Sequence, residues 1–304
     1  MKNPHIVIVG SANIDIVVEV KAFPKIGQTL QGKNFNTFLG GKGANQAVAA
    51  ARLGAEVTFI GCVGRDSFGE KILKSLKKEG IKTKIVQKGS SPTGTAIVTI
   101  NEHADNQILV IPGANFALTK EFTESALESI NKPEVLLLQL EVPLEIVTAA
   151  AIWGKKHGLL VILNPAPAPL SPLPKILLDN IDYIIPNEIE SYTITGESLP
   201  LAAAKKLKTQ GIPNIIITLS DKGALSYNGS PEFVPPFSVS AIDPTAAGDA
   251  FVSGVSIATF QKKSLKEAVT YANAIGALTA TKLGAQPSLP TRDEVLNFLN
   301  HNHN

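Results

Sequence analysis

An aspartate stands at the start of a long apolar stretch in the segment SAIDPTAAGDAFVSGVSIATF, residues 240–260. The small residues Ala246, Ala247 and Gly248 come directly before Asp249, and this order predicts a tight turn into the first turn of a helix. The first backbone N–H groups of a helix have no partner within it, and small side chains leave them open to an anion. Such a site can hold a phosphoryl group while Asp249 accepts the proton of an alcohol. An acid that only stabilises a helix start gives the same pattern.

Two earlier segments carry polar residues that could bind hydroxyl groups. In LGGKGANQAVAAARLG, several glycines allow the backbone to approach a ligand, and Lys42 and Asn45 supply donors before the expected helix. In SANIDIVVEV, Asn13 and Asp15 lie on the same face of an expected strand, where they could chelate a diol. Each segment alone is a weak signal, because glycine-rich turns and polar strand ends are common in proteins without a ligand there.

Two other patterns resemble phosphate loops but are incomplete. GQTLQGKN has the spacing of a Walker A loop, yet Asn34 replaces the residue that would bind Mg²⁺, and a strand-like segment follows. GKGANQ begins like a dinucleotide fingerprint and lacks its third glycine. None of the five histidines has the HExxH spacing or stands beside a candidate nucleophile. The sequence therefore gives little support to a P-loop enzyme, an NAD-binding protein or a hydrolase.

Composition narrows the class of protein further. The 304 residues are 44% hydrophobic, which is enough for a large core, and 28 basic residues nearly balance 26 acidic ones. This balance points to neither nucleic acid nor an anionic membrane as a partner. The most apolar stretch, VLLLQLEVPLEIVTAAAIWG, contains Glu141 and Glu145, so we interpret it as a strand and a helix. The single cysteine, Cys62, excludes an intrachain disulfide and fits a cytoplasmic protein.

Short apolar runs alternate with amphipathic segments along most of the chain. This alternation predicts one layered α/β domain over residues 1–304, with a central, mostly parallel sheet. Strands covered on both faces should be apolar throughout. The expected strands span residues 5–10, 57–64, 135–140, 159–165, 182–187 and 214–220, and the expected helices include residues 47–54, 71–80, 152–157 and 203–208.

Two regions, residues 14–38 and 93–111, contain strand-like segments without helices between them. IDIVVEV, TLQGKNF, TAIVTI and QILVI alternate polar and apolar residues, which is typical of an antiparallel sheet with one solvated face. We expect these two excursions from the main domain to form a small β-sheet lid.

Taken together, these segments resemble the ribokinase branch of the PfkB-type carbohydrate kinase family. The strongest matches are the signatures GGKGANQAVAAARLG and DPTAAGDAF, accompanied by IGCVGRDSFGE, LLQLEVP, NPAPA, PNEIE, ITLSDKGA and KLGAQPSLP. The resemblance covers nearly the whole chain. It implies a ribokinase-like three-layer α/β/α domain with a small β-sheet lid.

The resemblance also implies ATP-dependent phosphorylation of D-ribose at O5. Asp249 would be the base that deprotonates the sugar hydroxyl, while Ala246, Ala247 and Gly248 would hold the γ-phosphoryl group. The family's sugar-binding positions correspond to Asn13, Asp15, Gly41, Lys42, Asn45, Glu141 and Asp249. Its ATP-binding positions correspond to Asn187, Thr218, Leu219, Ser220, Asp221, Lys222, Gly223, Gly248 and Asn273.

Two cations are implied in the same way. Asn187 and Glu190 match the NxxE motif that helps the family hold Mg²⁺ and its waters. The loop that binds a monovalent cation, preferably K⁺, corresponds to Asp243, Thr245, Thr279, Lys282, Gly284 and Ser288. Pro244 stands where the family often has Thr, and its fixed φ would stiffen the loop between the cation and the phosphoryl group.

Other functions remain open from the sequence alone. The alternatives within the family are a deoxyribokinase, a fructokinase-like enzyme and a kinase of adenosine or pseudouridine. Asn13 favours ribose over deoxyribose, because a site that hydrogen-bonds a hydroxyl penalises its absence. A non-catalytic sugar sensor would be expected to lose the base, which is present here. Apolar lid positions Ile97, Val98 and Val110 predict a homodimer formed through the lid, as is common in the family.

Overall fold

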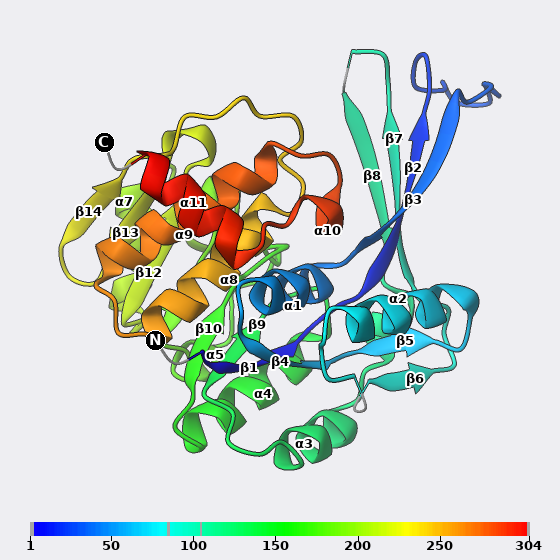
Figure 1. Cartoon of the computed structure of the whole chain (residues 1–304). Helices are drawn as coiled ribbons and strands as arrows, with labels where there is room; N and C mark the ends of the chain where they lie inside the picture. The colour runs from blue at the N-terminus through cyan, green and yellow to red at the C-terminus, as the bar shows by residue number, and fades with distance from the viewer. Residues whose placement is uncertain (1–2, 84–85, 104, 303–304) are drawn as a thin grey trace.

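A computed structural model describes residues 3–83, 86–103 and 105–302 of the chain. It contains a large sheet with helices on both faces and a smaller sheet that rises away from it (Figure 1). This arrangement confirms the predicted α/β fold. The predicted excursion over residues 93–111 includes residue 104, which lies outside the described residues.

The large sheet has eight strands in the order β14-β13-β12-β11-β10-β9-β1-β4. Its parallel strands are β1 (His5–Val9), β4 (Glu56–Ile60), β9 (Val135–Leu138), β10 (Leu160–Leu163), β11 (Tyr183–Ile184) and β12 (Asn214–Thr218). Two antiparallel strands that the sequence pattern did not predict complete one edge, β13 (Ala224–Tyr227) and β14 (Pro231–Val234). The expected strand 57–64 is divided at Gly61, because β5 (Cys62–Gly64) leaves the large sheet and pairs with β6 (Gln87–Gly89).

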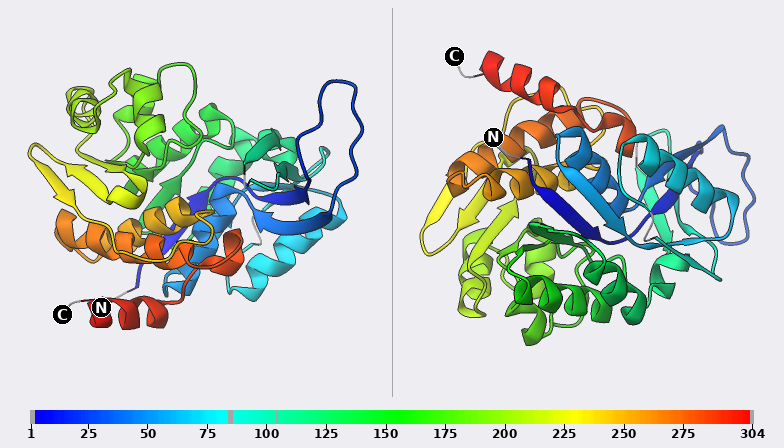
Figure 2. Two further views of the ribbon diagram at one scale, coloured as in Figure 1. Left: turned by 90° about the horizontal axis from the view of Figure 1, so that it is seen from above. Right: turned by 60° about the horizontal axis from the view of Figure 1, so that its bottom comes forward.

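Alternating residues of β1 enter two separate hydrophobic cores. Ile6 and Ile8 pack in one core, and Val7 and Val9 pack in the other, as the alternation of side chains along a strand requires. The helices on the first side are α1 (Lys42–Arg52), α2 (Ser67–Lys78), α8 (Ala247–Phe260), α9 (Leu265–Ala280) and α11 (Arg292–Asn302). Those on the second side are α3 (Lys120–Glu128), α4 (Leu144–Lys156), α5 (Lys175–Leu178) and α7 (Pro200–Thr209). The result is a three-layer α/β/α body (Figure 2).

The short elements lie near the ends of these layers. They are α6 (Glu188–Thr195), α10 (Ala285–Ser288) and the 3₁₀ turns η1 (Gly113–Ala117) and η2 (Ser220–Lys222). Across the described residues, no helix combines the length and apolar character that a membrane crossing requires.

The small sheet has four strands in the order β3-β2-β7-β8. They are β2 (Asn13–Glu19), β3 (Asn34–Gly40), β7 (Gly94–Ile100) and β8 (Asn106–Ile111). The β2–β3 and β7–β8 pairs are antiparallel as predicted, but β2 and β7 are parallel, so the expected antiparallel sheet is in fact mixed. The two excursions, β2–β3 and β7–β8, leave the body in the same direction. Their first strands, β2 and β7, pair with each other and are therefore parallel.

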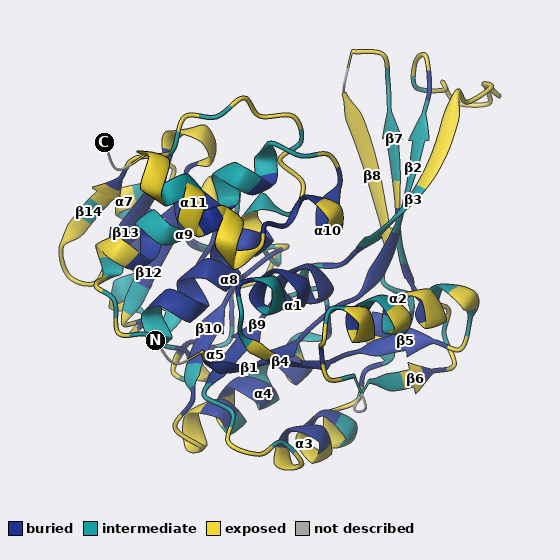
Figure 3. Ribbon diagram, in the orientation of Figure 1, coloured by how far each residue is buried: buried dark blue, intermediate teal, exposed yellow. Residues whose placement is uncertain are grey.

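The predicted strand TLQGKNF, residues 29–35, is placed too early. The strand begins at Asn34 because β3 pairs with β2 from Asn13 opposite Gly40 to Glu19 opposite Asn34, and β2 ends there. Residues 27–33 form an exposed loop instead. Exposure increases toward the outer strands of the small sheet, and every residue of β8 is exposed (Figure 3).

Candidate active site

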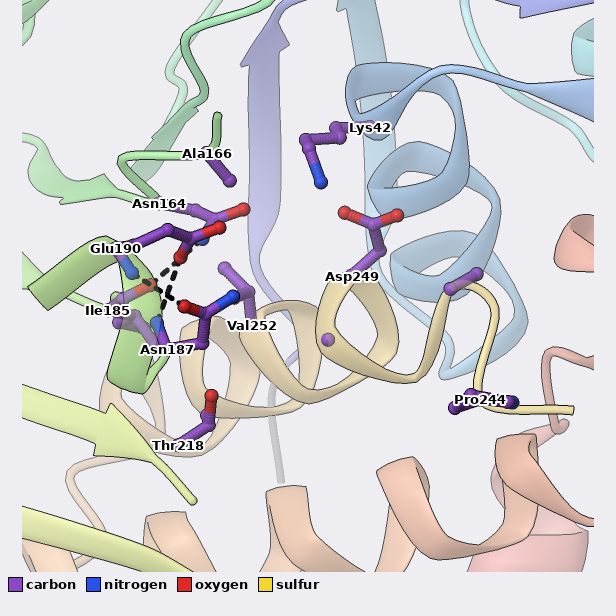
Figure 4. A pocket seen from close by; sticks show the side chains of 12 residues that line it. Lys42, Asn164, Ala166, Ile185, Asn187, Glu190, Thr218, Pro244, Asp249 and Val252 are labelled. Carbon is purple, nitrogen blue, oxygen red and sulfur yellow. Dashed lines mark hydrogen bonds between the residues drawn. The ribbon is translucent and has the colours of Figure 1, made fainter. Parts of the chain in front are cut away.

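A cavity of about 200 Å³ opens at the carboxyl ends of the parallel strands. Asn164 follows β10, Asn187 follows β11, and Thr218 ends β12, and all three line the cavity. The start of α8, with Gly248 and Asp249, forms the facing wall (Figure 4). Ligands of α/β proteins commonly bind at this edge of the sheet, so the strands and α8 place a candidate site together.

The start of α8 is open to a ligand. Its N-cap residue, Ala246, has left-handed backbone geometry with φ of 63° and makes no side-chain capping hydrogen bond. The N–H of Ala247 donates to the carbonyl of Pro244 at 3.1 Å, which closes the preceding turn. Apart from its chain neighbours and the backbone of its own helix, no atom of the described residues lies within 4 Å of the position that a Cβ on Gly248 would occupy. Backbone N–H groups at this helix start are therefore accessible to an anion.

Asp249 is buried, and two amides of α1 hold its carboxylate. Asn45 Nδ2 donates to Oδ2 at 3.0 Å, and Gln46 Nε2 donates to Oδ1 at 3.1 Å. Burial raises the pKa of Asp249, while the charge of Lys42 and the hydrogen bond from Asn45 act in the opposite direction. A carboxylate with a raised pKa and fixed orientation is suited to accept a proton.

Gln46 is a site residue that the sequence analysis did not identify, although it follows Asn45 in the glycine-rich segment. Its orientation is fixed by a chain of amides that starts at the backbone carbonyl of Ile185. That carbonyl accepts from Asn164 Nδ2 at 2.8 Å, and Asn164 Oδ1 accepts from Gln46 Nε2 at 3.1 Å. Because a carbonyl can only accept, Gln46 must present its nitrogen to Asn164 and to Asp249.

Lys42 and Glu141 lie close enough to Asp249 for their charges to act on it. Glu141 accepts from the backbone N–H of Lys42 at 3.0 Å and from Ser11 Oγ at 2.5 Å. Burial lowers the pKa of Lys42, but Asp249, Glu141 and other nearby carboxylates outweigh this effect, so its pKa is raised overall. The ammonium group therefore stays charged, and its side chain extends toward Asp249 (Figure 4).

The expectation that Lys42 and Asn45 precede the helix is wrong, since both belong to α1. The helix starts early because Gly41, with φ of 87°, already serves as its N-cap. A Cβ on Gly41 would lie 2.7 Å from the backbone nitrogen of Asn13, so the residue packs where only glycine fits. Asn45 Oδ1 is buried and has no hydrogen-bond partner among the described residues, which leaves an acceptor for a ligand hydroxyl beside Asp249.

Asp15 is held near the same carboxylates. Burial, with the charges of Glu141 and Asp249, raises the pKa of Asp15 to about 6. A Cβ on Gly40 would lie 2.2 Å from Asp15 Oδ2, so glycine at this position makes room for the carboxylate. Asn13, at the start of β2, is buried and accepts a hydrogen bond from Asn115 Nδ2 at 2.7 Å.

Asn187 and Glu190 form the capping box of α6. Glu190 N–H donates to Asn187 Oδ1 at 2.7 Å, and Asn187 N–H donates to Glu190 Oε2 at 2.8 Å (Figure 4). Burial raises the pKa of Glu190, which faces the charges of Lys42 and Asp249. Their carboxylate and amide oxygens are ligands of the type that Mg²⁺ prefers, and few direct ligands suffice for an ion that keeps its waters. No group of three or more His, Cys, Asp or Glu side chains in the described part of the chain could hold a metal ion by itself.

The segment expected to contact the nucleotide forms a turn after β12. Ser220 and Gly223 have positive φ angles of 55° and 96°, and η2 includes Asp221 and Lys222, which are exposed. A Cβ on Gly223 would lie 2.2 Å from a backbone oxygen. Leu219 is buried beneath the turn. Of residues 218–223, only Thr218 lines the cavity.

Asn273, the other residue expected to lie near the nucleotide, hydrogen-bonds to the backbone at the end of β14. Its Nδ2 donates to the carbonyl oxygens of Pro235 at 2.9 Å and Val234 at 3.4 Å. In this structure the side chain therefore fixes the segment after β14.

The structure brings part of the expected cation loop together. Asp243 Oδ1 accepts from the N–H and hydroxyl of Thr245 at 2.9 and 2.6 Å, and Oδ2 accepts from the N–H of Gly284 at 2.8 Å. Burial acts to raise the pKa of Asp243, but these hydrogen bonds outweigh it, so its pKa is lowered. The hydroxyls of Thr279 and Ser288 donate to backbone carbonyls, which leaves their oxygen lone pairs available.

Lys282 contributes differently, since its side chain forms an ion pair with Glu294 at 2.6 Å. The Lys282 side chain is thus engaged outside the loop, and the group that it can offer a cation is its backbone carbonyl oxygen. The donor set consists of oxygens, which fits a hard cation such as K⁺.

Comparison with known proteins places this geometry in a family. The model of the pfkB family carbohydrate kinases matches residues 3–292. A ribokinase of Haemophilus influenzae is 43% identical over 301 residues, with 97% of this chain and 98% of the relative covered. A deoxyribokinase of Salmonella typhi is 38% identical, with 98% and 99% covered. The structure of an Arabidopsis thaliana ribokinase complexed with ribose and ATP has a TM-score of 0.89 at 32% identity, covering 98% of this chain and 99% of that chain.

Proposed function

The chain belongs to the pfkB family of carbohydrate kinases, and we propose that it transfers the γ-phosphoryl group of ATP to O5 of D-ribose, giving D-ribose 5-phosphate and ADP. The observation that carries the chemistry is the buried Asp249 in the first turn of α8, beside backbone N–H groups that a ligand can reach. The assignment of ribose as the substrate is supported by full-length similarity to ribokinases and by the hydroxyl-binding groups around Asp249.

In this proposal Asp249 accepts the O5 proton while its own orientation is held by Asn45 and Gln46. The N–H groups at residues 246–248 would stabilise the negative charge of the transferring phosphoryl group, and the N–H of Ala247 would share this role with its hydrogen bond to Pro244. Lys42 compensates charge on the other side of the base. Phosphoryl transfer needs mainly positioning and charge stabilisation, and these groups supply both.

The sugar ring would be held by groups on three elements. Asn13 and Asp15 lie on β2, Lys42 and Asn45 on α1, and Glu141 follows β9. The unpartnered Asn45 Oδ1 would accept from a sugar hydroxyl, and the ionised Asp15 would do the same. Gly41, at the start of α1, allows the ring to approach the backbone.

Two cations complete the proposal. Glu190 and Asn187 would hold Mg²⁺ partly through water, and the ion would neutralise phosphate charge when bound. Asp243, Thr245, Gly284 and Ser288 would hold K⁺, and the ordered loop would fix the turn at Pro244 that precedes the phosphoryl site.

We extend the proposal to the small sheet as a lid over the sugar, which would exclude water from ATP. The exposed apolar residues of β8, including Leu109, support a homodimer formed through this sheet. We also place the enzyme in the cytoplasm, where ATP is available and the free, buried Cys62 would stay reduced.

The test is ADP release from ATP and Mg²⁺ with D-ribose, 2-deoxyribose, fructose, adenosine and pseudouridine, each with K⁺ or a non-activating cation. Release that depends on ribose supports the proposal, whereas a clear preference for another member of the panel refutes the substrate. Asp249→Asn should keep sugar binding and lose most turnover. Full activity of that variant would remove Asp249 as the base.

A further inference from the structure

Asn115 is a buried amide at the base of the small sheet that the sequence analysis did not identify. It lies in η1, directly after β8, and is 1% exposed. Its Oδ1 accepts from the backbone N–H of Ala12 at 2.9 Å, and its Nδ2 donates to Asn13 Oδ1 at 2.7 Å. Asn115 therefore connects the end of one excursion to the polar residue that begins the other.

The backbone of Ala12 fixes the orientation of both amides. A backbone N–H can only donate, so Asn115 must turn its oxygen toward Ala12 and its nitrogen toward Asn13. Asn13 must then present its oxygen to Asn115. The Nδ2 group of Asn13, a pure donor, is then directed away from Asn115 and is left for a ligand. This assignment follows from the backbone donor and does not depend on telling oxygen from nitrogen in either side chain.

Tight packing fixes where the two side chains lie. A Cβ on Gly94, the first residue of β7, would lie 2.2 Å from Asn115 Nδ2 and 2.3 Å from Asn13 Oδ1. The backbone of Asn13 is paired with Gly94 on one side and with Gly40 on the other. Asn13 itself is only 4% exposed. The glycine makes room for the amide pair, and the paired strands fix the backbone of Asn13.

We propose that Asn115 is a positioning residue that holds Asn13 as a hydrogen-bond donor toward the sugar and thereby sets which substituent the enzyme prefers at that ring position. The inference rests on the proposed sugar kinase function and deepens it. A hydroxyl oxygen accepts from Asn13 Nδ2, fluorine accepts weakly, and a hydrogen substituent does not accept. An unmet donor in a buried site penalises the substrate that lacks the acceptor.

Asn115→Asp is the sharpest perturbation, because it preserves shape and the acceptor for the Ala12 N–H. The new second oxygen would face Asn13 Oδ1, so the Asn13 amide should rotate and turn its oxygen toward the sugar. Asn13→Asp, a substitution in the other member of the pair, should also place an acceptor toward the sugar. One oxygen of the carboxylate introduced by Asn13→Asp would accept from Asn115 Nδ2, and the other would face the ligand.

The assay measures kcat/KM for D-ribose and for its 2-deoxy, 2-deoxy-2-fluoro, 3-deoxy and 3-deoxy-3-fluoro analogues. At the ring position that faces Asn13, the unsubstituted enzyme should have a higher kcat/KM for the fluoro analogue than for the deoxy analogue. The expected ratio is about threefold to tenfold, as for one neutral hydrogen bond. In both variants this order should invert, since fluorine and an amide or carboxylate oxygen repel each other. D-ribose should keep part of its activity because a hydroxyl can also donate.

The control is Asn106→Asp, which makes the same change at an exposed residue of β8. It should leave the fluoro-to-deoxy order unchanged. A general loss of structure lowers kcat/KM for all substrates together, so it cannot invert the order of the fluoro and deoxy analogues. Thermal unfolding shows whether Asn115→Asp folds. If it does not fold, the fluoro-to-deoxy order of Asn13→Asp decides whether the proposal holds.

An unchanged order at both ring positions in a folded variant overturns the role of Asn115. The proposed function fails separately, if the unsubstituted enzyme does not phosphorylate ribose at all.

Discussion

Replacing Gln46 with Met tests whether this buried amide keeps the carboxylate of Asp249, the proposed base, ionised. Gln46 is fully buried, and its Nε2 donates to Asp249 Oδ1 at 3.1 Å. A hydrogen bond to a charged group contributes about 1.5–3 kcal/mol, which corresponds to roughly a tenfold to hundredfold change in equilibrium. Removing the donor destabilises the ionised form and so raises the pKa of Asp249. A base must be ionised, so the acid limb of kcat should move to higher pH.

The assay is kcat as a function of pH at saturating ribose and ATP. On the acid limb, Gln46→Met should lower kcat by roughly tenfold or more, following the hydrogen-bond energy above, and the rate should recover as pH rises. The substitution also removes partners of Gln139 and Asn164, so thermal unfolding must show that the variant is folded. A loss of the same factor at every pH would refute the reasoning, because it would mean that Gln46 maintains geometry alone.

Ser253→Ala is the matched control for this experiment. Ser253 Oγ lies 3.0 Å from the backbone oxygen of Gln46 and 2.9 Å from that of Asp249, in the same contact between α1 and α8, and its one hydroxyl hydrogen is shared between these two acceptors. The substitution removes this buried hydrogen bond at a cost of about 1 kcal/mol, without touching the Asp249 carboxylate. It should lower the unfolding temperature and leave the acid limb of kcat unchanged.

Four further outcomes are expected. Because burial and nearby carboxylates raise the pKa of Asp15 to about 6 and its ionised form would accept sugar hydroxyls, KM for ribose should rise below that pH, and Asp15→Asn should remove this dependence of KM while raising KM at pH 8. Gly40→Ala would press on Asp15 Oδ2, so KM for ribose should rise more than tenfold, the size of a lost charged hydrogen bond, while KM for ATP changes little. Asp243→Asn should weaken the activation by K⁺ in a cation titration, and equal activation in both proteins would contradict the proposed loop. Leu109→Lys, on the exposed β8, should give a monomeric mass in sedimentation if the small sheets form the dimer.

The sequence predicted the elements whose signals are local. Asp249 was identified because small residues and a helix start are adjacent in the chain, and the parallel strands were identified because their apolar runs are continuous. Gln46 and Asn115 were missed because their partners are distant, with a sequence separation of 203 positions from Gln46 to Asp249 and of 102 from Asn115 to Asn13. The start of β3 was misplaced for the same reason, since pairing with β2 determines it. Local chemistry can be inferred from types and spacing, whereas orientation depends on contacts that the fold creates.

The charges of the site explain why its groups must act together. Four carboxylates, those of Asp249, Glu141, Glu190 and Asp15, act on the single ammonium group of Lys42, so negative charge is in excess. A neutral sugar can enter this environment, because its hydroxyls donate to carboxylates without adding charge. In the proposed function ATP would bring further negative charge to the same cavity, and its approach would require compensation from the helix start and from a cation beside Glu190. The excess of carboxylates thus favours hydroxyl binding and, for the same reason, would make the proposed phosphoryl transfer dependent on Mg²⁺.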